Sequence, residues 1–122
     1  MAKIGFVIQT EPYKFQAVDT LFNMIDAARR KGHEILGVFF FGSGVYGVQR
    51  RIDPGATVRN LPEAIKTRLA DQGIALIGCR TWLQTDGMSE EVRLESVRDE
   101  GLAALTEIAK DADKLIVFGA GV

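Results

Sequence analysis

Residues 34–41 read EILGVFFF, and every position from 35 to 41 is apolar or glycine. An apolar run without alternating polar residues is typical of a strand that is buried on both faces in a parallel sheet. Gly32, two residues before the run, ends a stretch in which apolar residues recur at helical spacing. The run therefore predicts the central strand of an α/β fold, with a helix before it.

Strand-like and helix-like segments alternate on both sides of this run. Apolar runs predict strands at 3–9, 74–79 and 114–118. Helical spacing predicts helices at 16–31, from Asn60 to just before Gly73, and at 102–112. Asn60 is the expected cap of the second helix, with Pro62 in its first turn and the Glu63 side chain reaching back to the cap. This alternation predicts a parallel sheet with right-handed crossovers and helices on both faces.

Residues 91–97 read EVRLESV and fit either a strand or the end of a helix. We favour a strand, because a sheet of about four strands would otherwise be small. The predicted fold class is α/β, a three-layer α/β/α sandwich with a mostly parallel sheet of about five strands. It occupies residues 1–122 as a single domain.

Composition excludes several classes of protein. The chain has one cysteine, Cys79, and one histidine, His33, too few for a structural zinc site or a disulfide framework. No metal or cofactor is therefore expected. A net charge of −1 gives no reason to expect direct nucleic-acid binding. The first apolar segment is broken by Gln9, Glu11 and Pro12, so it is neither a signal peptide nor a membrane span, and we expect a cytoplasmic protein.

The predicted topology sorts the candidate functional residues by sheet edge. Ligands of parallel sheets bind at the carboxyl ends of the strands. Tyr13, Ser43 and Cys79 each follow or end a predicted strand, whereas His33 precedes one. His33 is therefore expected at the opposite edge, and a catalytic pair of Cys79 with His33 is not expected.

Cys79 can be read in two ways. A thiol at the carboxyl end of a strand faces the start of the next helical turn, where the helix dipole and the neighbouring Arg80 would favour the thiolate. Tyr13, Ser43 and Gly44 would then line the approach to the thiol. The alternative is that Cys79 is a small buried hydrophobe, as free cysteines often are.

Residues 42–47, GSGVYG, formally match the G-x-G-x-x-G pattern of dinucleotide-binding proteins. That pattern normally follows the first strand and opens a helix directly. Here it follows the second strand and leads to Asp53-Pro54-Gly55, which a helix cannot cross. Nucleotide binding by this loop remains a third possibility.

These features together resemble the DsrE/TusD-like sulfur-relay family over nearly the whole chain. The resemblance is carried by residues 10–46 (TEPYKFQAVDTLFNMIDAARRKGHEILGVFFFGSGVY), 74–79 (IALIGC) and 101–119 (GLAALTEIAKDADKLIVFG). Pro-Tyr after the first strand, Gly-His-Glu before the second and a lone cysteine at the end of the third form the specific combination.

The resemblance implies a sulfurtransferase or sulfur carrier. In this family the matching cysteine, here Cys79, accepts sulfane sulfur as a persulfide and passes it to a partner protein. Members serve oxidative sulfur metabolism or tRNA thiolation, with TusA-like or related proteins as donors and acceptors. They assemble as homo-trimers or homo-hexamers, or with sister subunits.

The chain departs from the family pattern at several positions. Ser43 stands where relatives often have aspartate, and Arg80, Trp82 and Asp86 alter the charge and bulk after Cys79. These changes predict that the partner differs from those of the best-known members. The rival hypothesis is a non-catalytic oligomeric subunit or small-molecule-binding module in which Cys79 is only structural.

Overall fold

The computed structural model describes residues 1–119 of the chain. Its strands are β1 (Lys3–Ile8), β2 (Glu34–Phe40), β3 (Leu76–Cys79), β4 (Val97–Glu100) and β5 (Lys114–Phe118). Its α-helices are α1 (Ala17–Arg30), α2 (Leu61–Arg68), α3 (Arg80–Thr85) and α4 (Leu102–Asp111). Three short 3₁₀ helices, η1 (Gly42–Val48), η2 (Ala70–Gln72) and η3 (Glu90–Val92), complete the described elements.

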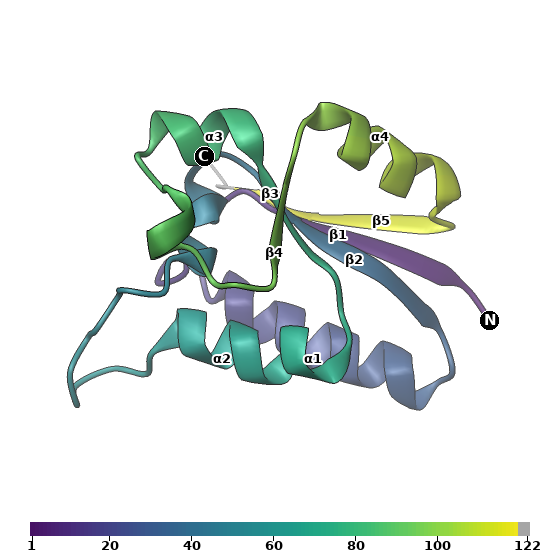
Figure 1. The fold of residues 1–122 in the computed structure, drawn as a ribbon. Helices are drawn as coiled ribbons and strands as arrows, with labels where there is room; N and C mark the ends of the chain where they lie inside the picture. Colours follow the sequence, from purple (N-terminus) through teal and green to yellow (C-terminus); the bar gives the residue numbers. More distant parts are fainter. Residues whose placement is uncertain (120–122) are drawn as a thin grey trace.

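The five strands form one sheet in the order β4-β3-β2-β1-β5, and every pair is parallel (Figure 1). The predicted α/β fold is confirmed, with β2 at the centre of the sheet as its apolar run indicated. In Figure 1, α1 and α2 lie on one side of the sheet and α3 and α4 on the other.

Alternate side chains of β1 and β2 pack into two separate hydrophobic cores, one on each face of the sheet. Phe6 and Phe40 belong to the larger cluster, which includes the apolar residues of α1 and α2. Val7 and Phe39 belong to a smaller cluster that also contains Ile108 of α4. Because a strand presents successive side chains to opposite faces, two buried faces require an unbroken apolar run.

The fifth strand is present but not where the sequence pattern placed it. Residues 91–97 were expected to form a strand, whereas Glu90–Val92 form η3 and β4 begins only at Val97. Arg93 makes an isolated antiparallel bridge with Gln49, and Leu94 is buried in the larger core. The apparent alternation before Val97 thus reflects packing of an irregular segment, not membership of the sheet.

The start of α2 matches its predicted cap. The Asn60 side chain accepts a hydrogen bond from the Glu63 backbone N–H at 3.1 Å, and Pro62 lies in the first turn. Residues 42–47 form the 3₁₀ helix η1 and do not open an α-helix. Among the helices of residues 1–119, none is long and apolar enough to cross a membrane.

Candidate functional site

Cys79 is the last residue of β3 and the residue directly before α3. Its backbone is extended (φ −66°, ψ 117°), so the chain passes from strand to helix without a linker. The turn is tight, since a Cβ on Gly78 would lie 2.8 Å from Cδ1 of Leu83 in α3. The strand-to-helix turn therefore fixes the position of Cys79 at the carboxyl edge of the sheet.

The thiol side chain is buried. Cys79 is 1% exposed and belongs to the smaller core with Val7, Phe39, Ile77 and Ile108. This cluster lies on the α4 side of the sheet. A reagent or partner can reach the sulfur only after some of the surrounding side chains move.

Phe41 and Trp82 pack on this cluster from the carboxyl edge. Phe41 follows β2 and Trp82 lies in α3, and their rings meet edge to face with centroids 5.9 Å apart and planes at 73°. Such aromatic contacts stabilise by about 0.5–1.5 kcal/mol beyond the burial of area. The pair therefore closes the carboxyl-edge side of the Cys79 cluster.

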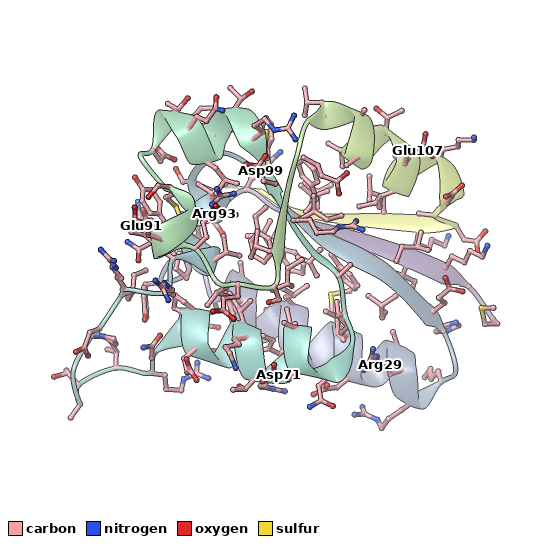
Figure 2. All side chains as sticks on the ribbon, in the orientation of Figure 1. Arg29, Asp71, Glu91, Arg93, Asp99 and Glu107 are labelled. Carbon is pink, nitrogen blue, oxygen red and sulfur yellow. The ribbon has the colours of Figure 1, made fainter. Side chains whose placement is uncertain are left out.

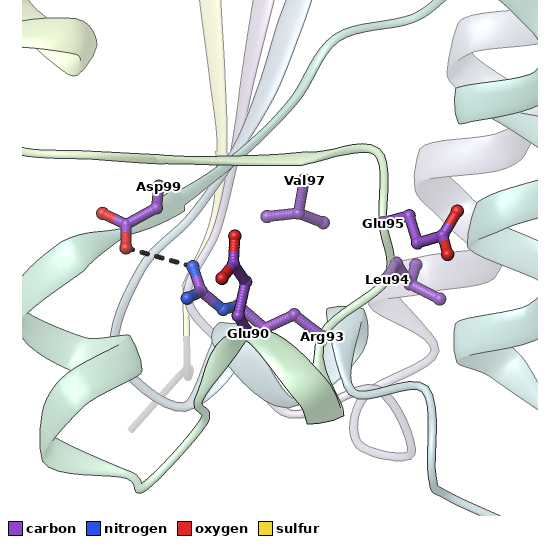
Figure 3. Close-up of a pocket in the computed structure, with 6 residues that line it drawn as sticks. All are labelled: Glu90, Arg93, Leu94, Glu95, Val97 and Asp99. Carbon is purple, nitrogen blue, oxygen red and sulfur yellow. Dashed lines mark hydrogen bonds and ion pairs between the residues drawn. The ribbon is translucent and has the colours of Figure 1, made fainter.

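Arg80 binds a carboxylate on the neighbouring strand. Its Nε donates to Oδ1 of Asp99 at 2.6 Å, and its Nη2 donates to the backbone oxygen of Asp99 at 2.9 Å. Arg93 donates from Nη1 to the other oxygen of the same carboxylate at 3.0 Å, as Figure 3 shows. The role expected for Arg80 at the thiolate would require it to leave Asp99, and that role remains a prediction.

The two arginines also control the charge of Asp99. Burial acts to raise the pKa of Asp99, but the hydrogen bonds and positive charges of Arg80 and Arg93 outweigh it and hold the pKa below its ordinary value. Asp99, Arg93, Glu90 and Val97 line a pocket of about 420 Å³ on the α1–α2 side of β4 (Figure 3). Asp99 is thus a charged anchor that ties α3 and the segment before β4 to the sheet.

We expect Asp99→Asn to lower the free energy of unfolding by about 1–2 kcal/mol at neutral pH, because two arginines lose their charged acceptor. A carboxyl whose folded pKa is lowered stabilises the fold above its unfolded pKa, and this contribution disappears as pH falls through the folded pKa. Urea unfolding over a pH series should show the free energies of unfolding of the native and Asp99→Asn proteins converging in acid.

Asp71→Asn, which breaks an exposed pair with Lys66 at 3.3 Å, is the control and should change the free energy of unfolding little. A constant difference at all pH values would contradict the assignment.

Tyr13, Ser43 and Gly44 lie in different surroundings from one another. The Tyr13 hydroxyl donates to the Arg59 oxygen at 2.8 Å and accepts from the Leu61 N–H at 3.1 Å, which ties the segment after β1 to the start of α2. Ser43 is exposed and lines a pocket of about 270 Å³. Gly44 is buried against the backbone of β1. Their proposed place on the approach to Cys79 stays a prediction.

His33 lies at the opposite edge from Cys79, as predicted. It directly precedes β2, and its Nδ1 accepts a hydrogen bond from the Ala2 N–H at 2.9 Å. No group of three or more His, Cys, Asp or Glu residues that could hold a metal occurs within residues 1–119.

Sequence reasoning missed the neighbours of Cys79 on β4 and α4. Glu100 is the register partner of Cys79 on β4, and Ala104 and Leu105 of α4 pack on the Cys79 cluster. The only signal for Glu100 would have been the correct position of β4, which has no apolar alternation to reveal it.

A model of the DsrE/DsrF-like family matches residues 2–118. The chain belongs to the DsrE/DsrF-like family. This match covers all five strands and all four α-helices, so the family resemblance expected from the sequence is confirmed.

One relative and two solved structures are similar to this DsrE/DsrF-like chain. The protein named "Putative sulfurtransferase DsrE" of Allochromatium vinosum is 30% identical, and the alignment covers 96% of this chain and 98% of that protein. The crystal structure of the ychN protein from E. coli superposes with a TM-score of 0.82 at 22% identity, over 97% of this chain and all of the other. MTH1491 from Methanobacterium thermoautotrophicum, titled a protein of unknown function, gives a TM-score of 0.73 at 16% identity, over 95% and 99% of the two chains. The two solved structures share the fold of this DsrE/DsrF-like chain.

Proposed function

We propose that this protein is a sulfur carrier that accepts sulfane sulfur as a persulfide on Cys79 and passes it to a partner protein. The observation that carries the proposal is the position of the lone cysteine. Cys79 ends β3 at the carboxyl edge and directly precedes α3, in a chain that matches the DsrE/DsrF-like family over residues 2–118. The similarity to the protein named "Putative sulfurtransferase DsrE" supports the same chemistry.

The proposed transfer requires two balanced thiol exchanges. The Cys79 thiolate attacks the terminal sulfur of a donor persulfide, a new S–S bond forms at Cys79, and the donor leaves as a thiolate with the electron pair of the broken S–S bond. An acceptor thiolate then attacks the terminal sulfur on Cys79, and the Cys79 thiolate is the leaving group. No external oxidant or reductant is consumed.

A single cysteine suits this role. A second thiol in the same chain could attack the inner sulfur of the persulfide, close a disulfide and release sulfide. Cys79 is the only cysteine in the sequence, so no other thiol in the chain can release the sulfur as sulfide. The proposed donors and acceptors are TusA-like or related proteins, in oxidative sulfur metabolism or tRNA thiolation.

The test is the intact mass of the native protein after incubation with a sulfane-sulfur donor. We expect a gain of one or more sulfur atoms that reductant reverses and that Cys79→Ser abolishes completely. An unchanged mass with both a small-molecule donor and a persulfidated donor protein would contradict the proposal.

A second candidate function rests on the burial of Cys79. At 1% exposure the thiol packs as an ordinary core side chain would, which favours a non-catalytic oligomeric subunit or a small-molecule-binding module. Alkylation separates the two. Labelling of Cys79 in the folded protein supports the carrier, and labelling only after denaturation supports the structural role.

We further propose that the protein forms a homo-oligomer through the exposed face of β5, at the opposite edge of the sheet from β4. Val117 of β5 pairs in register with the buried Val7, so its side chain lies on the α4 side of the sheet, yet it is 50% exposed. Leu115 of β5 and Leu102 of α4 are 39% and 56% exposed. Leu115 and Val117 lie two positions apart on β5 and so share one face. Exposed apolar residues that share a face are typical of an interaction surface. Light scattering should find a trimer or hexamer, and a monomer at micromolar concentration would contradict this.

A further inference from the structure

A groove between α4 and β4 lies beside Cys79. It has a volume of about 300 Å³. Its apolar residues are Leu36, Ile77, Ala104 and Ile108, and all four belong to the cluster that surrounds Cys79. The groove and Cys79 therefore adjoin the same apolar cluster, and Cys79 lies behind the residues that line the groove.

The register of the sheet brings one groove residue next to the cysteine. Cys79 of β3 pairs with Glu100 of β4, and Glu100 lines the groove. Paired residues on neighbouring strands project to the same side of a sheet, and the strands lie about 4.8 Å apart. Glu100 is thus the ionisable side chain that β4 presents beside the thiol.

The charge of the groove is negative. Ala104, Glu107, Ile108 and Asp111 are spaced as one stripe along α4, and Figure 2 labels Glu107 on that helix. Arg98 is the one cation that lines the groove, and its Nε is paired with Oε2 of Glu100 at 3.1 Å. Glu107 and Asp111 make no ion pair with any described residue and are exposed. The groove therefore carries two exposed carboxylates that make no ion pair within residues 1–119.

We propose that this groove is the docking site for a basic segment of the partner protein that exchanges sulfur with Cys79. The inference rests on the proposed function and specifies the partner. Lysine or arginine side chains beside the partner's cysteine would pair with Glu107 and Asp111, while the cysteine itself enters past Ile77 and Ala104. The same carboxylates repel small anionic donors such as thiosulfate or glutathione persulfide, because like charges raise the free energy of approach at low salt. The carboxyl-edge side is closed by Phe41 and Trp82.

Two short peptides test the proposal, each with one cysteine activated as a mixed disulfide with thionitrobenzoate. The cysteine is flanked by lysines in one peptide and by glutamates in the other. The Cys79 thiolate attacks the peptide sulfur, the new S–S bond joins peptide and protein, and coloured thionitrobenzoate leaves with the electron pair. We expect the lysine peptide to react about tenfold faster than the glutamate peptide at low salt. The ratio should approach one in about 1 M salt, where charges are screened within about 3 Å.

The double variant Glu107→Gln and Asp111→Asn should remove most of this difference, since it conserves side-chain size and cancels the two free charges. Glu63→Gln with Glu95→Gln is the matched control. It makes the same change in net charge beside α2 and should keep the native ratio. Equal ratios in native protein and groove variant would overturn the proposal, as would a native Cys79 that reacts with neither peptide. The assay needs no persulfide, so its failure is distinguishable from a failure of sulfur uptake.

Discussion

Gly44→Ala is expected to lower the free energy of unfolding by about 3 kcal/mol or more, the largest effect of any single methyl group we foresee. A Cβ at position 44 would collide with the backbone oxygen of Ile8 and lie 2.8 Å from its carbonyl carbon. That same oxygen accepts the hydrogen bond from the Phe41 N–H at 2.9 Å. To admit the methyl group, η1 must move away from β1, and this hydrogen bond is strained or lost.

Urea unfolding monitored by circular dichroism measures the effect. Gly101→Ala is the matched control, because a Cβ there would meet no atom within 4 Å and the φ of −79° suits alanine. We expect the control to stay within about 1 kcal/mol of the native protein. A Gly44→Ala protein with the native unfolding midpoint would contradict this, because it would show that η1 can shift to admit the methyl group without loss of stability.

Trp82→Ala is expected to speed alkylation of Cys79 in the folded protein by about tenfold or more. Alkylation of a thiol that is 1% exposed depends on local opening, and a decrease of about 1.4 kcal/mol in the opening free energy raises the open population tenfold. Trp82 contributes its edge-to-face contact with Phe41 and its packing on the Cys79 cluster. Loss of both should lower the opening free energy by about that amount or more.

The rate of modification by neutral iodoacetamide, followed by intact mass, measures the effect. Trp82→Phe keeps an aromatic ring and should react at close to the native rate. Leu69→Ala destabilises the larger core on the other side of the sheet and controls for global unfolding. A rate increase in Leu69→Ala equal to that in Trp82→Ala would show that Cys79 is reached only by global unfolding.

The sequence predicts most of the fold because β1, β2 and their helices are buried on periodic faces. The apolar run from Ile35 to Phe41 serves two cores, and the Asn60 cap is satisfied as expected. β4 escaped prediction because it is an edge strand that reads VRDE, and its three charged residues give no apolar alternation. Its position depends on pairing with β3, which is a tertiary contact.

The candidate site was predictable in position but not in its contacts. That Cys79 ends β3 follows from the apolar run before it. That Arg80 turns to Asp99, or that Tyr13 holds the start of α2, depends on residues 19 and 48 positions away in the sequence. Side-chain partners at such separations leave no local pattern, so the sequence alone gives no sign of the Arg80–Asp99 pair.

The pairing of β1 with β5 has a consequence for synthesis in the cell. Lys3 donates its backbone N–H to the Asp113 side chain, 110 positions later, and β5 then lies along β1 from Ile4 to Ile8. Until residues 114–118 leave the ribosome, β1 presents an open strand edge, and contacts of such long range form slowly. The nascent chain should therefore remain a client of chaperones until β5 has emerged, and loss of β5 should give aggregation instead of a smaller folded protein.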